Sequence, residues 1–112
     1  MTEQEAHAHV DRFNAAVTGG DWPAFAATFH PDAVMEFEGP PVGPFVGRDA
    51  IAAAYAANPP DDTMRIRRVD TRGDTELIAF RWSRGGTGTM EIDRVGGLIT
   101  RLLVRFDLGR SV

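Results

Sequence analysis

The fold is decided by residues 33–48, which read AVMEFEGPPVGPFVGR. Ala33 to Phe37 is apolar and predicts a strand, which ends on the carboxylate of Glu38. A loop rich in proline and glycine, Gly39 to Val46, follows and closes on Gly47-Arg48. A carboxylate held in an apolar environment is costly unless it has a use. Glu38 is therefore the first candidate functional residue.

Two helices are predicted before this stretch. The first begins with Thr2 and Glu5, which have the spacing of a capping box, and it ends at Gly19-Gly20. Asp21 then caps a short second helix, which His30-Pro31 stops. These two helices lead directly into the predicted strand.

A third helix and four more strands are predicted after the loop. Asp49 caps an alanine-rich helix that runs to about Ala57. The residues beyond Pro59-Pro60 then alternate between apolar and charged, which is typical of strands with one apolar and one charged face. The predicted strands are Thr63 to Thr71, Thr75 to Ser83, Thr87 to Asp93 and Leu98 to Asp107. We therefore expect an α+β fold in a single domain, residues 1–112, whose antiparallel meander buries its apolar face against three helices.

Charge and composition argue against several classes of function. The net charge of −4, with no basic cluster longer than Arg67-Arg68, argues against a nucleic-acid partner. No apolar run approaches the roughly 20 residues that span a bilayer, so we expect no membrane association. The start of the chain, Met1 to Glu5, is polar and lacks a secretory pattern, so we expect a cytoplasmic location. Lysine and cysteine are absent, which excludes Schiff-base and thiolate chemistry.

Cofactor, metal and serine-nucleophile sites are not supported either. Only two serines, Ser83 and Ser111, are present, so a Ser-His-Asp hydrolase is not expected. No glycine-rich loop has the spacing that binds phosphate. His7 and His9 are two residues apart on a helix and point to different sides, so we expect both to be solvated and to share no metal. The sequence predicts a protein that uses no cofactor and no metal.

The order of elements and four local signatures resemble a known superfamily. The signatures are Gly20-Asp21, Phe29 to Val34, Gly47 to Ile51 and Gly97 to Ile99. They resemble the nuclear transport factor 2-like superfamily, which includes SnoaL-like and ketosteroid isomerase-like proteins, over essentially the whole chain. The resemblance implies a cone-shaped, curved antiparallel sheet packed against three N-terminal helices and enclosing an apolar pocket. This fold hosts isomerases, polyketide cyclases and proteins with no chemistry, so it does not determine the function.

Within that superfamily the pattern is similar to ketosteroid isomerase. Counting back from Gly47-Arg48 without a gap puts Glu38 at the place of that family's catalytic aspartate, and Tyr55 falls at a pocket tyrosine. The resemblance implies Glu38 as the base that moves a proton next to a carbonyl group, with Tyr55 as a hydrogen-bond donor. The family's main oxyanion-hole tyrosine corresponds to Phe13 here, and its protonated aspartic acid falls near Gly88.

The predicted ligand pocket is apolar and aromatic. Such a pocket suits a small, flat hydrophobic molecule, steroid-like or polyketide-like as the resemblance implies. The resemblance also implies a homodimer formed through the open face of the sheet. The residues expected to line the pocket are Phe13, Val17, Phe29, Met35, Phe80, Trp82, Met90, Leu102 and Phe106.

Alternatives stay open for both candidate residues and for the function. One residue of register decides whether Glu38 or Phe37 faces the pocket, and strict alternation places Glu36 on the same face as Glu38. Tyr55 lies on the helix face that should pack on the sheet, so a core role fits the pattern as well as catalysis does. The competing functions are a polyketide cyclase-like enzyme and a non-catalytic module for small-ligand binding or dimerisation.

Overall fold

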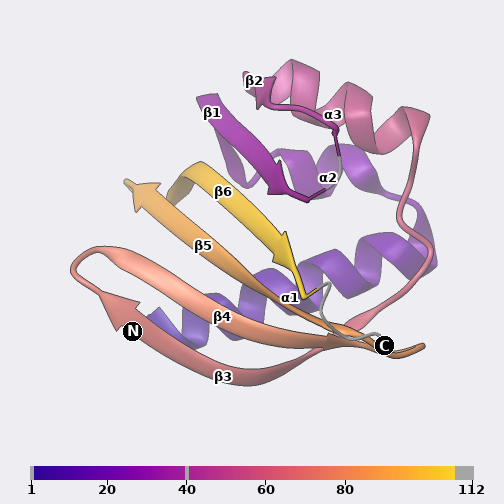
Figure 1. Cartoon of the computed structure of the whole chain (residues 1–112). Coiled ribbons are helices and arrows are strands. Elements are labelled where there is room, and N and C mark those ends of the chain that lie inside the picture. The colour runs from indigo at the N-terminus through magenta and orange to yellow at the C-terminus, as the bar shows by residue number, and fades with distance from the viewer. Residues whose placement is uncertain (1, 40, 108–112) are drawn as a thin grey trace.

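The computed structural model describes residues 2–39 and 41–107, which form three helices and six strands (Figure 1). The predicted α+β class, with a curved sheet packed against three helices, is confirmed. Along the chain the elements are α1 (Thr2–Gly19), α2 (Trp22–Ala26), β1 (Phe29–Glu38), β2 (Phe45–Val46), α3 (Arg48–Ala57), β3 (Met64–Arg72), β4 (Thr75–Trp82), β5 (Thr87–Val95) and β6 (Leu98–Phe106).

The six strands form one mixed sheet in the order β2-β1-β6-β5-β4-β3. The predicted meander is observed, because β3, β4, β5 and β6 pair antiparallel with their sequence neighbours. The one parallel pairing joins β1 to β6, so the first and last strands of the chain lie side by side in the middle of the sheet. The short strand β2, which falls inside the predicted loop, pairs antiparallel with the outer edge of β1.

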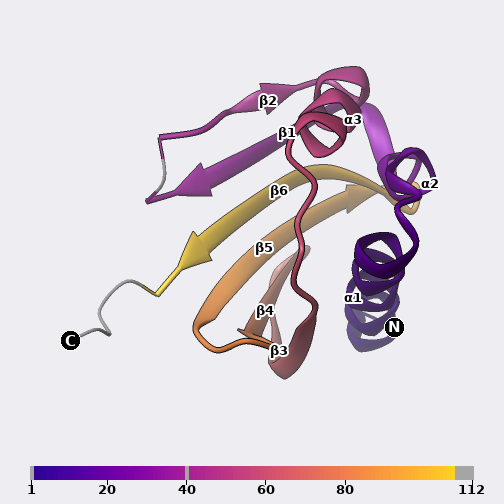
Figure 2. The same cartoon turned by 90° about the vertical axis from the view of Figure 1, so that its right-hand side faces the viewer.

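The three helices cover one face of the sheet (Figure 2). α1 packs on β3 and β4, α3 packs on β1 and β2, and α2 contacts both other helices. Asn14 of α1 fixes the start of β3, because its side-chain amide donates to Met64 O at 2.8 Å and accepts from Met64 N at 2.9 Å. None of the helices formed by the described residues has the length and the hydropathy of a membrane span.

The core lies between the inner face of the sheet and the helices. Alternate strand residues point inward, as the period of two requires, and they meet the apolar stripe of α1. The sheet residues with the most complete burial are Phe29, Met35, Ile78, Phe80, Ile92, Ile99 and Leu102. The buried apolar residues of α1 are Ala6, Val10, Phe13 and Ala16.

Local signals predict the start of α2 correctly but miss its end. The side chain of Asp21 caps the helix by accepting a 3.2 Å hydrogen bond from Ala24 N. The helix already ends at Ala26, and His30-Pro31 belongs to β1 instead of stopping the helix. Strand pairing with β6, which begins at Phe29, outweighs the local stop signal.

The predicted start of α3 is also wrong, because Gly47 and not Asp49 occupies the N-cap. Gly47 has φ of +96°, a conformation that favours glycine, and its N–H donates to Ala33 O at 2.7 Å. The Nε of Arg48 donates to Phe29 O at 3.0 Å, which attaches the first helical residue to β1. Contacts with β1 therefore set the start of this helix, and Asp49 lies in its first turn.

The substitution Gly88→Ala should destabilise the fold. A Cβ at this buried position of β5 would lie 2.5 Å from Arg105 O and 2.6 Å from Phe80 Cζ, and the backbone oxygen has no room to move. We expect the free energy of unfolding to fall by about 1–3 kcal/mol in urea titrations followed by circular dichroism.

The matched control is Gly19→Ala at the last residue of α1, where a new Cβ would meet no atom within 4 Å. This variant should be as stable as the wild type or slightly more stable, because alanine favours the helix. Equal stability of the two variants would contradict the close packing of Gly88.

Candidate functional site

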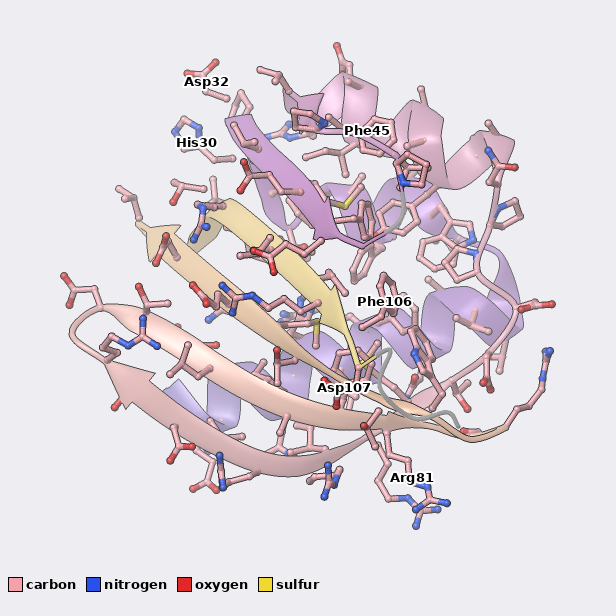
Figure 3. All side chains as sticks on the ribbon, in the orientation of Figure 1. His30, Asp32, Phe45, Arg81, Phe106 and Asp107 are labelled. Atoms are coloured by element: carbon pink, nitrogen blue, oxygen red, sulfur yellow. The ribbon has the colours of Figure 1, made fainter. Side chains whose placement is uncertain are left out.

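A cavity of about 200 Å³ lies between the inner face of the sheet and the helices. Its lining is almost entirely apolar and aromatic, and it includes one residue, Pro60, of the segment that joins α3 to β3. Figure 3 shows Phe106 on the side of β6 that faces the helices, whereas Arg81 projects away from the molecule. The lining residues are His9, Phe13, Phe37, Tyr55, Pro60, Met64, Trp82, Met90, Leu102, Val104 and Phe106.

The register of β1 places Phe37, and not Glu38, in this cavity. Phe37 pairs with Val104 of β6, and both side chains line the cavity. Glu38 pairs with Arg105 and points to the opposite face, as does Glu36. The only irregularity in the β1–β6 pairing lies between Phe29 and Val34, so alternation continues unbroken to the strand end. The predicted placement of Glu38 in the apolar pocket is corrected: Phe37 faces the cavity.

Glu38 belongs to a network of ion pairs on the outer face. Arg105 donates from Nε to Glu38 at 2.9 Å and also bonds Glu91. The hydrogen bond from Arg105 is the largest cause that lowers the pKa of Glu91. Arg101 extends the network to Glu36, with Nε and Oε1 3.4 Å apart. The side chain of Glu38 is 57% exposed, so it is a solvated pairing partner and not a buried carboxylate.

The hollow that Glu38 borders differs in character from the apolar cavity. It measures about 370 Å³ and lies on the outer face, where Glu38, Glu36 and Arg101 line it together with residues 41–44 of the loop. The carboxylates and the guanidinium in its wall already pair with one another. The structure therefore keeps Glu38 apart from Tyr55, which lines the cavity on the other side of the sheet.

Five of the predicted lining residues surround the cavity, and the others are packed in the core. Phe29 and Phe80 have no exposed surface and Met35 has 1%, so none of them borders open space. Val17 is partly buried and packs against the core. The position matched to the protonated acid, Gly88, has no room for a side chain, because the Phe80 ring fills that space. The predicted residues that line the cavity are Phe13, Trp82, Met90, Leu102 and Phe106.

Tyr55 is held rigidly by two aromatic rings of α2. Its ring stacks on Trp22 with centroids 4.6 Å apart and planes 2° apart, and it meets the edge of Phe25 at 5.4 Å. The side chain is 8% exposed, and burial raises its pKa above the ordinary value. Tyr55 therefore presents a protonated hydroxyl at neutral pH, as a hydrogen-bond donor requires.

His9 is the functional candidate that sequence reasoning missed. It was expected to be solvated, but it is 2% exposed and its ring lies 5.4 Å from the ring of Phe25. Burial is the main cause that lowers its pKa from the ordinary 6.5 to about 3, and the charges of Arg94 and Arg12 add to the shift. The signal was its spacing, because His9 follows Ala6 by three residues and precedes Phe13 by four on the buried stripe.

The polar groups of His9 and Tyr55 are unused. Neither the imidazole nor the phenol forms a side-chain hydrogen bond with another described residue. Among the described residues the only sealed side-chain polar atom without a partner is Oε1 of Glu76, so the His9 and Tyr55 polar atoms reach open space. Since both residues line the cavity, their hydrogen-bonding capacity is available to a molecule inside it.

Three aromatic rings with nearly parallel planes form one wall of the cavity. Phe106 lies between the other two, 6.3 Å from Phe37 and 6.5 Å from Trp82 between centroids. The planes differ by 10° in the first pair and by 13° in the second. All three side chains are partly exposed, whereas His9 and Tyr55 are buried. The aromatic wall therefore lies toward solvent and the two polar groups lie deeper.

The site is suited to holding an uncharged molecule. No Asp, Glu, Lys or Arg is among its described lining residues. Within residues 2–39 and 41–107, no group of three His, Asp or Glu side chains is arranged to hold a metal ion. The imidazole of His9 is a weak base because its pKa is about 3. The arrangement can bind apolar surface and can exchange hydrogen bonds with one or two polar atoms.

Comparison with known proteins places this arrangement in a family. A model of the family described as "SnoaL-like domain" matches residues 10–102. No curated protein matches the chain significantly. The match over most of the chain agrees with the predicted resemblance to the nuclear transport factor 2-like superfamily, which is confirmed.

Several solved structures share the fold. A candidate ketosteroid isomerase from Kribbella flavida has a TM-score of 0.74 and 18% identity, over 97% of this chain and 82% of that chain. A candidate polyketide cyclase from Sinorhizobium meliloti has a TM-score of 0.69 and 25% identity, over 87% of this chain and 93% of that chain. A nuclear transport factor 2-like protein of unknown function from Burkholderia xenovorans has a TM-score of 0.70 and 16% identity, over 98% and 88%.

The buried imidazole of His9 should make the stability depend on pH. Its folded pKa of about 3 lies below the ordinary 6.5, so the unfolded chain binds a proton between these values that the folded chain does not. The free energy of unfolding should therefore fall as the pH falls from about 6.5 toward about 3. The contribution of His9 is about 1.4 kcal/mol per pH unit within that window.

Urea titrations at several pH values would measure this contribution as the difference between wild type and His9→Gln. We expect a shallower acid loss of stability in His9→Gln, whereas His7→Gln, a change on the exposed side of the same helix, should follow the wild type. The same slope in all three proteins would show that His9 takes up its proton without unfolding.

Proposed function

The chain belongs to the SnoaL-like domain family, and from this premise we propose that it binds a small, largely apolar molecule carrying a keto or hydroxyl oxygen. The observation that carries the proposal is the cavity of about 200 Å³, whose apolar wall contains two unused neutral polar groups. The names of two similar structures, a candidate ketosteroid isomerase and a candidate polyketide cyclase, both refer to keto compounds.

The two polar side chains define how such an oxygen would be held. The hydroxyl of Tyr55 donates a hydrogen bond, and the neutral imidazole of His9 either donates or accepts one. Each bond contributes about 0.5–1.5 kcal/mol net, because the ligand gives up hydrogen bonds with water on binding. Removing apolar surface from water supplies the larger share, at about 25 cal/mol per Å² of area buried.

The isomerase-like or cyclase-like reaction is the second candidate function, and the geometry supports it less. Proton transfer needs a base within hydrogen-bond reach of the reacting carbon. Glu38 points to the outer face, where it pairs with Arg105. His9 is in the cavity, but it is a weak base at a pKa of about 3. A non-catalytic ligand-binding module is therefore our first proposal, ahead of an enzyme that uses Glu38 as its base.

The variant Tyr55→Phe should bind a neutral ketone more weakly than the wild type. With 1-indanone as the probe, we expect a three- to tenfold rise in Kd, about the loss of one hydrogen bond. The phenyl ring can keep the stack on Trp22, so the fold should be preserved. Isothermal titration calorimetry measures Kd, and circular dichroism checks the fold.

Glu38→Gln is the matched control for this experiment, since it changes a carboxylate on the opposite face of the sheet. It should bind 1-indanone as the wild type does. It should also leave unchanged any conversion of a β,γ-unsaturated 3-ketosteroid to its conjugated enone, followed by absorbance. A collapse of that conversion in Glu38→Gln would restore Glu38 as the base and make the isomerase the first proposal.

We also propose that a second copy of the chain covers the outer face of the sheet. The three helices leave that face open (Figure 2). Arg65 and Arg81 lie directly opposite each other on β3 and β4, and neither forms an ion pair with another described residue. Like charges placed opposite each other destabilise a sheet unless an acidic partner joins them. A second copy would supply such carboxylates and form a homodimer.

Charge reversal by Arg81→Glu should weaken this dimer. We expect sedimentation velocity to show a smaller dimer fraction than in the wild type at equal protein concentration. The control Arg12→Glu makes the same charge change on exposed α1, on the helical side of the molecule, and should leave the dimer fraction unchanged. A wild type that sediments as a monomer at all concentrations would refute the dimer.

A further inference from the structure

Resting on the proposed function, we infer that the ligand is an uncharged, flat ketone of one or two fused aromatic rings. Its ring lies against the wall formed by Phe37, Phe106 and Trp82, and its oxygen points to the deeper His9 and Tyr55. Three independent features of the cavity carry this assignment: its volume, the geometry of its aromatic wall and the absence of charge in its lining.

The volume limits the ligand to one or two rings. A cavity of about 150 Å³ holds benzene, and pockets for drug-sized molecules measure about 300–1,000 Å³. The present cavity, at about 200 Å³, lies between these values and close to the smaller one. A four-ring steroid would have to displace buried side chains such as Met90, which is 3% exposed. Close-packed interiors resist such displacement.

The aromatic wall selects a flat ring. The planes of Phe37, Phe106 and Trp82 are parallel to within about 10–15°, so a flat ligand can lie parallel to the same set of planes. Trp82 is braced by Phe80, which meets it at an interplanar angle of 81°, and Phe80 has no exposed surface. A saturated, puckered ring of the same size presents no π-face and cannot pair with the wall in this way.

The direction of insertion follows from the depth of the residues. The aromatic wall is partly exposed, while the side chains of His9 and Tyr55 are buried at 2% and 8% exposure. Both rings contact the same Phe25 ring, each with centroids 5.4 Å apart, so the two polar groups flank one region of the cavity. A ligand that enters with its oxygen first brings that oxygen to the buried donors and leaves its ring at the wall.

The lining excludes a charged ligand. None of the described lining residues carries a charge, and transferring an ion into such a site is far more costly than transferring a ketone. Arg94, which acts on His9, is itself paired with Glu76 and lies 3.8 Å from Glu5 in an ion pair. Its charge is therefore compensated within the protein and does not serve as a partner for a ligand carboxylate.

The test compares four probes with the wild-type protein by isothermal titration calorimetry. Chromone is the flat, neutral, two-ring ketone. Chromone-2-carboxylate adds a negative charge to the same rings, 1-decalone keeps two rings and the keto group but is saturated, and androst-4-ene-3,17-dione has four rings. We expect chromone to bind about 100-fold more tightly than the carboxylate. We expect it to bind about three- to tenfold more tightly than 1-decalone, and more tightly than the steroid.

A pair of variants tests the aromatic wall directly. Phe106→Leu keeps an apolar side chain but removes the central ring of the wall, so chromone should bind about three- to tenfold more weakly while 1-decalone is unaffected. Phe45→Leu is the control, because Phe45 meets Phe37 edge-on at 6.4 Å but does not line the cavity. Figure 3 labels both Phe45 and Phe106. Phe45→Leu should bind both probes as the wild type does.

The outcomes separate this inference from the proposed function. Binding of 1-decalone or of the steroid as tightly as chromone would overturn the flat-ring assignment and leave the proposed function standing. Equal binding of the carboxylate would overturn the exclusion of charge. If neither 1-indanone nor any of the four probes binds, the proposed function fails and the inference fails with it. The probe series on the wild type decides the matter even where a variant does not fold.

Discussion

The parallel pairing of β1 with β6 is the constraint on which the rest of the structure depends. It sets the register in which Phe37 lies beside Val104 and Glu38 lies beside Arg105. One face of that pairing becomes the wall of the apolar cavity, and the other becomes a network of carboxylates and guanidinium groups. A slip of one residue would exchange the two faces, with a carboxylate inside and a phenylalanine outside. Burial of the inner face opposes such a slip, because it would expose apolar surface and bury charge.

The character of the cavity follows from what the helices bring to that wall. α1 contributes His9, whose burial among aromatic rings keeps the imidazole neutral, and α3 contributes Tyr55, whose burial keeps the phenol protonated. Both groups were removed from water when the protein folded and formed no hydrogen bond with another described residue. A polar atom in such a position is costly to leave unpaired. The same cost makes the cavity selective for a ligand that supplies an uncharged oxygen.

Much of the fold could be predicted from the sequence, and the candidate site only in part. The alternation in residues 64–106 and the glycine-rich turns predict the four-strand meander, because periodicity and turn chemistry are local properties. The start of α3 was missed, because hydrogen bonds from Gly47 and Arg48 to β1 set it, and their partners are distant in sequence. His9 was misjudged because its spacing from His7 was weighed and its spacing from Ala6 and Phe13 was not. The single domain, the cytoplasmic location and the lack of a nucleic-acid partner, cofactor or metal stay predictions.

The sequence by itself determined the class of the fold, the family and the presence of an apolar, aromatic interior, because these depend on periodicity, turn residues and composition. Only the tertiary structure decided which side chains face the interior. Glu38 and Phe37 are neighbours on one strand, and no local signal separates their roles, because the two-residue period merely puts them on opposite faces. The pairing of β1 with β6, 67 residues apart in sequence at Glu38 and Arg105, sends Phe37 into the cavity and Glu38 out to the ion pairs.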